Sequence, residues 1–159
     1  MENLHWGTLF MGAFYTSCRV HHTVDREKKV ELPKLLVDTG SEYGQLRTGQ
    51  LVLRLDRQHR IYIDLEAVGI DNQTIMVVEI KCFEDSAIET TELYGAIGQY
   101  LVYRSLLREH DVQVPLYLAV PRHAYEGVIN RMALSVMTQN DVKMIVVDLE
   151  REAVIQWLS

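Results

Sequence analysis

Apolar and polar residues alternate along three consecutive stretches of the chain, 51–55, 60–66 and 75–82. Alternation with a period of two is typical of a half-buried β-strand. Turn-forming residues separate the stretches, at 56–59 and again at 69–73. Because short links of this kind join antiparallel neighbours, we predict a three-stranded antiparallel meander over this part of the chain.

The pattern changes to a helical period between residues 86 and 109. The apolar residues that recur there at helical spacing are Leu93, Ile97, Tyr100, Leu101 and Leu107. Glu89 and Glu92 lie in the first turns, where negative charge suits the dipole of the predicted helix. Gly95 and Gly98 lower its stability, and we expect them to allow a close approach between this helix and the sheet.

Three further strands and one further helix are predicted after this helix. Residues 115–120 (PLYLAV) form a nearly continuous apolar run, which is typical of a strand buried on both faces. Residues 123–138 have helical spacing, and 143–148 and 152–158 are predicted strands, the last with Trp157 as an anchor in the core. The order of elements predicts an α/β fold in which helices flank a mixed central β-sheet.

Length and composition are those of one soluble globular domain, residues 1–159, with 48% hydrophobic and 24% charged residues. The apolar stretch 6–15 is too short to cross a bilayer and has no basic leader. No later apolar run is longer, so we expect a cytoplasmic protein without a membrane segment. Cys18 and Cys82 form no disulfide or zinc pattern, and Cys82 is expected to be a small buried side chain in a reducing compartment.

The net charge of -6 argues against a general nucleic-acid coat protein. Residues 1–60 hold nine Lys and Arg against seven Asp and Glu, whereas residues 61–159 hold seven against fifteen. A surface that contacts phosphate would draw on the basic residues near the predicted meander. These are Arg47, Arg54, Arg57 and Arg60. The acidic balance suggests that a partner supplies part of any contact with DNA.

Charged residues gather on the two later strands of the predicted meander. Glu79 and Lys81 are two residues apart, so they share one face of their strand. By the same alternation, Asp64 shares a face with Tyr62 and Glu66. The opposite face of that strand is expected to carry Ile61, Ile63 and Leu65. If the strands pair, three carboxylates and one ammonium converge, and buried charge of this kind needs a partner or a metal.

The chemistry that this arrangement suggests is hydrolysis of a phosphodiester with the help of a divalent ion. Mg²⁺ or Mn²⁺ prefers hard oxygen ligands, and Asp64 and Glu79 are the candidate ligands, with Glu66 as a third carboxylate. Lys81 would offset negative charge beside the phosphate or the attacking water. The spacing D-(x)14-E-x-K fits the PD-(D/E)XK nuclease signature. The alternatives are a sheet edge with solvated charges, or a Glu79–Lys81 pair that only neutralises itself.

Gln99 and Tyr103 form a Q-x-x-x-Y pattern on the helix that follows the E-x-K strand. Residues four apart share a helix face, so both side chains can reach the same site. This pattern resembles the accessory motif of RecB-like nucleases, and it adds both residues to the candidate catalytic set. The alternative is that Gln99 is an ordinary polar residue and Tyr103 belongs to the core.

A closer resemblance covers 51–159, with the segments YIDL, VEIKCF, AIGQYLVYRSLL, LYLAVP, MIVVD and IQWL. Together they resemble the XisH family of fdxN element excision controlling factors, and GQY-x-x-Y and LYLAVP are the most specific. The resemblance implies a restriction-endonuclease-like core. It also implies a role in programmed excision of a DNA element in cyanobacteria, together with a site-specific recombinase and a small partner, XisI. Residues 1–45 do not show the acidic front helix expected of such a core and form a divergent N-terminal segment.

Two functions from different classes follow. The chain is either a regulatory factor that binds XisI, the recombinase or DNA without cutting, or an active Mg²⁺-dependent endonuclease on the same scaffold. Self-association into a homo-oligomer is compatible with both. Cleavage of DNA that depends on Asp64 and Lys81 distinguishes the second function from the first.

Overall fold

The computed structural model describes residues 47–68, 74–151 and 153–159 of the chain. The predicted N-terminal segment 1–45, with its apolar stretch 6–15 and Cys18, lies outside the described residues. No helix in the described ranges is long and apolar enough to cross a membrane.

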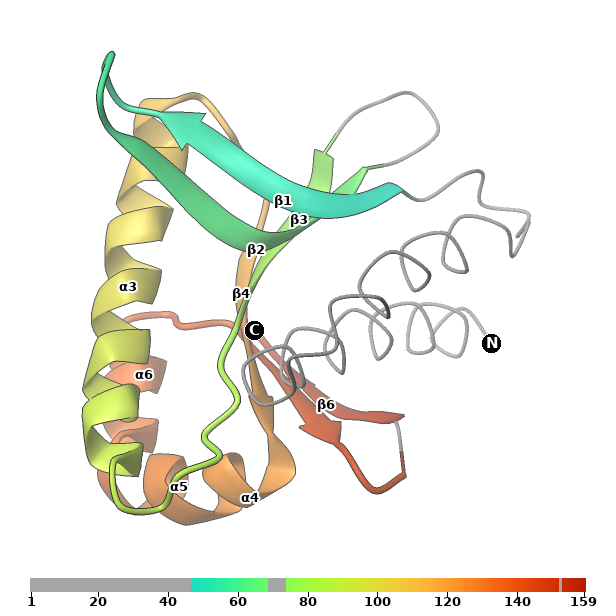
Figure 1. Cartoon of the computed structure of the whole chain (residues 1–159). Helices are drawn as coiled ribbons and strands as arrows, with labels where there is room; N and C mark the ends of the chain where they lie inside the picture. Colours follow the sequence, from blue (N-terminus) through green and yellow to red (C-terminus); the bar gives the residue numbers. More distant parts are fainter. Residues whose placement is uncertain (1–46, 69–73, 152) are drawn as a thin grey trace.

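Within the described residues, six strands form one mixed sheet, in which neighbours in the sequence are neighbours in space (Figure 1). The strands are β1 (Arg47–Arg54), β2 (Arg60–Val68), β3 (Thr74–Ile80), β4 (Leu116–Pro121), β5 (Met144–Asp148) and β6 (Ala153–Leu158). β1, β2 and β3 pair antiparallel, which confirms the predicted meander. β3, β4 and β5 pair parallel, and β6 returns antiparallel to β5. The predicted mixed α/β architecture is therefore present.

A long helix, α3 (Glu89–Glu109), connects β3 to β4 and packs along one face of the sheet (Figure 1). Parallel strands need such a crossover, because their ends lie on opposite edges of the sheet. The Tyr100 hydroxyl, which is buried under α3, donates a hydrogen bond to the carbonyl oxygen of Leu116 at 2.9 Å. The hydroxyl oxygen of Tyr100 in turn accepts a hydrogen bond from the backbone N–H of Lys143 at 3.0 Å. Tyr100 thus ties α3 to the starts of β4 and β5.

The second helical region is broken, although the sequence pattern predicts one helix over 123–138. It consists of α4 (Arg122–Ala124), a π-helical turn η1 (Tyr125–Ile129), α5 (Asn130–Met132) and α6 (Leu134–Gln139). Gly127 has non-helical angles, φ −93° and ψ −106°. A residue without a Cβ reaches this conformation at low cost, and the apolar spacing gives no sign of it.

The sheet has a buried cluster on each face. The cluster that contacts the helices includes Ile63, Val77, Leu118 and the buried residues of α3. The other includes Leu65, Val78, Ile80, Ala119 and Ile145. β4 and β5 contribute to both clusters, as expected of central strands buried on two sides.

Three expectations about single residues are wrong. Atoms placed at the Cβ positions of Gly95 and Gly98 would have no neighbour within 4 Å, so these glycines serve no close approach to the sheet. The side chain of Trp157 is 41% exposed and packs edge-to-face on Tyr117, because β6 is an edge strand. Cys82 is joined in a disulfide rather than being a free thiol, and the chain's other cysteine lies outside the described residues.

Candidate functional site

A β-bulge in β2 sets the direction of Asp64. Gly49 pairs with Glu66 and Leu51 pairs with Ile63, so one residue of β1 stands opposite two of β2, Asp64 and Leu65. An extra residue in one strand shifts the alternation of its side chains. Ile63 accordingly packs in the cluster beneath the helices, whereas Leu65 packs in the cluster on the other face.

The predicted alternation along β2 is therefore wrong at this point. Ile63 and Leu65 do not share a face, and Asp64 does not continue the row of Tyr62, whose side chain is 49% exposed. Downstream of the bulge, Leu65 pairs with Val78 on β3. Asp64 and Glu79 are the next residues along the two strands, so the bulge turns Asp64 toward Glu79 and the helix side of the sheet.

Glu79 and Lys81 follow the predicted alternation at the end of β3. Glu79 pairs in the parallel register with Leu118 of β4, and its side chain is only 4% exposed. The ammonium Nζ of Lys81 lies 3.0 Å from Oε1 of Glu79, with the Lys81 side chain 26% exposed. The structure thus brings these two residues together on the face that α3 covers.

The charge of Asp64 acts on the carboxyl of Glu79. Oδ2 of Asp64 accepts a hydrogen bond from the backbone N–H of Ile80 at 2.9 Å, which holds Asp64 beside the end of β3. Burial, and then the charge of Asp64, raise the pKa of Glu79 to about 6, although the nearby Lys81 ammonium acts in the opposite direction. A buried carboxyl next to a second carboxylate is held near the protonation boundary at neutral pH.

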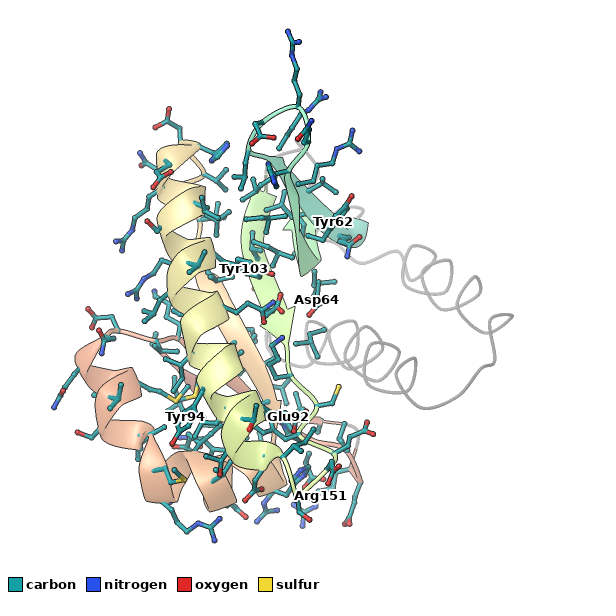
Figure 2. The ribbon with its side chains drawn as sticks, turned by 60° about the vertical axis from the view of Figure 1, so that its left-hand side comes forward. Tyr62, Asp64, Glu92, Tyr94, Tyr103 and Arg151 are labelled. Atoms are coloured by element: carbon teal, nitrogen blue, oxygen red, sulfur yellow. The ribbon has the colours of Figure 1, made fainter. Side chains whose placement is uncertain are left out.

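α3 adds a phenol and an amide to the two strands. Nε2 of Gln99 donates a hydrogen bond to the Tyr103 hydroxyl at 2.9 Å. Burial raises the pKa of Tyr103, and the charges of Glu79 and Asp64 act in the same direction. Figure 2 shows the Tyr103 side chain projecting from α3 toward the strands, at the level of Asp64. The accessory pair predicted from the sequence therefore lies beside the carboxylates.

One oxygen of this site lacks a partner. Oε2 of Glu79 is buried and has no hydrogen bond, while Oε1 bonds to Lys81. Buried polar atoms are nearly always satisfied, and the exceptions need an explanation such as a missing water or ion. Two carboxylates, one with an unused and desolvated oxygen, are a donor set that suits a hard divalent cation.

Glu66 does not complete a set of three metal-ligating side chains. It pairs with Gly49 and Val77, one position beyond the bulge, and its side chain is half-buried. Within the described ranges, no three His, Cys, Asp or Glu side chains are grouped closely enough to hold a metal. The arrangement thus offers two carboxylates to a cation, and water or substrate oxygens would supply the other ligands.

Sequence reasoning missed Glu92, which it assigned only to the charged N-terminus of the helix. Oε2 of Glu92 is buried and has no hydrogen-bond partner, as in Glu79. Burial, and then nearby acidic side chains, raise the pKa of Glu92, and Lys81 acts in the opposite direction. The separations of seven and four residues between Glu92, Gln99 and Tyr103 would have indicated one helix face.

Two cavities of the described part lie away from these residues. A cavity of about 510 Å³ is lined by Tyr100, Arg104, Lys143 and their neighbours, and one of about 290 Å³ by Arg122, Asp148 and theirs. Neither is lined by Asp64, Glu79 or Lys81. Charge and burial, rather than cavity size, distinguish the candidate site.

Two crystal structures resemble this chain. One is an XisH family protein from Nostoc punctiforme PCC 73102, with 22% identity, a TM-score of 0.61 and coverage of 92% of this chain and 99% of that one. The other is an fdxN element excision controlling factor protein from Anabaena variabilis, with 24% identity, the same TM-score and coverage of 92% and 98%. At these identities, the similarity establishes a shared fold.

A comparison with curated proteins finds no match. The family model described as XisH protein matches residues 45–155, which is more than half of the chain and includes Asp64, Glu79, Lys81, Gln99 and Tyr103. On this evidence, the chain belongs to the XisH family.

Proposed function

We propose that this protein is an excision controlling factor for a DNA element, and that Asp64, Glu79 and Lys81 form a divalent-cation site for phosphodiester hydrolysis in DNA. Family membership and the excision factor from Anabaena variabilis support the first part. The observation that carries the second part is the buried, unpartnered Oε2 of Glu79, a carboxylate on which the charges of both Asp64 and Lys81 act.

The same residues support a restriction-endonuclease-like core as part of this proposal. An acidic residue from β2, an E-x-K pair at the end of β3 and a Q-x-x-x-Y pair on α3 come together across three consecutive elements. Isolated motifs of this kind occur by chance. Their proximity around the buried Glu79, one of whose carboxylate oxygens has no partner, is what favours a functional site over a solvated sheet edge.

Each side chain has a role in the proposed reaction. Asp64 and Glu79 would hold Mg²⁺ or Mn²⁺, which when bound lowers the pKa of water and stabilises charge on phosphate. Lys81 presents an ammonium that can donate to a phosphate oxygen and offset the charge of the scissile group. The Tyr103 hydroxyl accepts a hydrogen bond from Nε2 of Gln99 at 2.9 Å, and this bond orients the hydroxyl beside the carboxylates.

Nicking of supercoiled plasmid in Mg²⁺ or Mn²⁺ tests this function. The wild-type protein should nick the plasmid, and Asp64→Ala and Lys81→Ala should each lower the rate by about 100-fold or more, as losses of electrostatic groups do. Asp111→Asn, at an exposed position after α3, is the control for loss of a carboxylate and should keep the wild-type rate, because asparagine tolerates the positive φ of 58° there. Equal activity, or equal inactivity, of the wild type and both site variants would refute cation-dependent cleavage.

A second candidate is a non-cutting adaptor that binds an XisI-like protein, the recombinase or DNA. The net charge of -6 favours it, because a chain with this charge has a weak grip on DNA by itself. Two exposed apolar side chains on α3, Tyr94 (63%) and Val102 (54%), offer part of a protein contact. Figure 2 shows Tyr94 on the flank of α3 away from Asp64.

Co-purification with an XisI-like protein and the recombinase distinguishes the adaptor from the nuclease. Partner binding that survives Asp64→Ala but is lost in Tyr94→Ser, without any nicking by the wild type, would establish the adaptor. Measurable nicking without binding to either protein would exclude it.

A further inference from the structure

The ammonium of Lys81 forms an ion pair with Glu79, the carboxylate that the proposed cation would bind. It lies 3.0 Å from Oε1 of Glu79, and this contact compensates part of the buried negative charge. A divalent cation on Glu79 would place a second positive charge next to Nζ. Like charges in a poorly solvated site repel strongly, so Lys81 has to leave Glu79 when the cation arrives. Its flexible four-carbon chain permits such a movement.

Glu92 offers Lys81 a second acceptor. Its Oε2 is buried without a hydrogen bond, so one oxygen is desolvated and available to a donor. Among the described residues, the charged groups that act on Glu92 are the carboxylates of Asp85, Glu84 and Glu89 and the ammonium of Lys81. The Lys81 ammonium and the Glu92 carboxylate therefore already attract each other.

The helix geometry places Glu92 on the correct face. Glu92 precedes Gln99 by seven residues and Tyr103 by eleven, which corresponds to two and three turns of α3. Figure 2 shows Glu92 and Tyr103 on the same flank of α3, with Glu92 nearer the helix N-terminus. Lys81 follows the end of β3, forms an ion pair with Glu79 and acts on Glu92 through its charge.

We infer that Glu92 is a positioning residue that receives the Lys81 ammonium when a divalent cation takes the oxygens of Glu79. The inference rests on the proposed cation site and adds a conformational step to it. An acidic cluster alone would not support it. The independent observation is Glu79, which is 4% exposed and whose Oε2 has no hydrogen-bond partner among the described residues, although its Oε1 holds Lys81. In this inference Lys81 moves from the buried carboxylate of Glu79 to the half-buried carboxylate of Glu92, and its position reports whether the site is filled.

Calorimetric titration of Mn²⁺ into the full chain tests this step. Glu92→Gln should weaken Mn²⁺ binding about tenfold, because Lys81 then lacks a charged acceptor and stays on Glu79. Glutamine has the shape of glutamate, so the packing of α3 is kept. Lys81→Met should bind Mn²⁺ at least as tightly as the wild type, since no ammonium competes. Glu109→Gln, at the exposed end of the same helix, is the matched control and should bind as the wild type does.

The decisive comparison is Glu92→Gln in the Lys81→Met background. If Glu92 acts through Lys81, the second substitution has no further effect on Mn²⁺ affinity there. An equal loss in both backgrounds would mean that Glu92 attracts the cation directly, and would overturn the inference. Wild-type affinity in Glu92→Gln would also overturn it and leave the cation site intact. A wild type that does not bind Mn²⁺ would instead reject the proposed function, and the inference with it.

Discussion

We predict that Glu79, a residue of the candidate site, destabilises the fold at neutral pH, because its carboxyl is buried. Burial, together with the charge of Asp64, raises the pKa of Glu79 from its ordinary value of 4.5 to about 6. This difference corresponds to about 2 kcal/mol between the ionised and the neutral carboxyl. Glu79→Gln keeps the shape of the side chain and removes the ionisation.

The sign follows from the direction of the pKa change. A group whose pKa is higher in the folded than in the unfolded protein contributes stability that is fully present below the unfolded value, here 4.5. That contribution is lost as the pH rises through about 6. The wild type should therefore lose about 2 kcal/mol of unfolding free energy between pH 4.5 and 7.5 that the Glu79→Gln variant keeps.

Urea unfolding measures this difference. Both proteins are unfolded at pH 4.5 and 7.5 in the presence of EDTA, and far-UV circular dichroism follows the transition. Contributions of the other titrating groups cancel when the variant and the wild type are compared at each pH. If the difference in unfolding free energy between the two proteins does not change with pH, ionised Glu79 does not destabilise the fold and the argument is refuted.

Three further substitutions have expected effects on stability. Gly98→Ala should raise the unfolding free energy by about 0.5–1 kcal/mol, and the thermal midpoint with it. Alanine favours the helix over glycine, and the added methyl group would have no neighbour within 4 Å. Tyr100→Phe should lower the unfolding free energy by about 1–3 kcal/mol in urea, because the backbone N–H of Lys143 loses its acceptor. Asp148→Asn should lower the thermal midpoint at pH 7, because the backbone N–H of Arg151 holds the pKa of Asp148 below its ordinary value of 3.8. That stabilisation is present above pH 3.8 and lost as the pH falls further, so the gap between Asp148→Asn and the wild type should close on acidification.

The strand pattern was predictable because burial is periodic. Alternation identified β1 to β3, and the apolar run ending at Pro121 identified a central strand, since a strand covered on both faces must be apolar throughout. The relation between Glu79 and Lys81 was also predictable. Residues two apart share a face of any strand, whatever surrounds it, and these two are 3.0 Å apart.

The position of Asp64 depended on a feature that no alternation argument contains. The bulge arises because Gln50 of β1 stands opposite two residues of β2, which is a property of the pairing and not of either strand. Asp64 therefore lies near Glu79 for a different reason from the one the sequence suggested. The same extra residue is why Ile63 and Leu65 pack on opposite faces.

Other errors have the same origin in tertiary structure. Helical spacing over 123–138 could not show the π-helical turn. Gly127 departs from helical backbone angles, but the apolar residues around it still recur at helical spacing. The helix-dipole argument explained Glu92 at the start of α3 and gave no sign that its Oε2 is buried without a hydrogen bond. Burial of a charged group is visible only when the packing around it is known.

The central claim is that Asp64 and Glu79 hold one divalent cation beside Lys81. Anomalous diffraction from crystals grown with Mn²⁺ tests it most directly, because the signal locates the metal without any assumption about a substrate. The account predicts one strong peak between the carboxylates of Asp64 and Glu79, absent from crystals of Glu79→Gln. No peak at these residues in the wild type, or a peak that persists in Glu79→Gln, would contradict it.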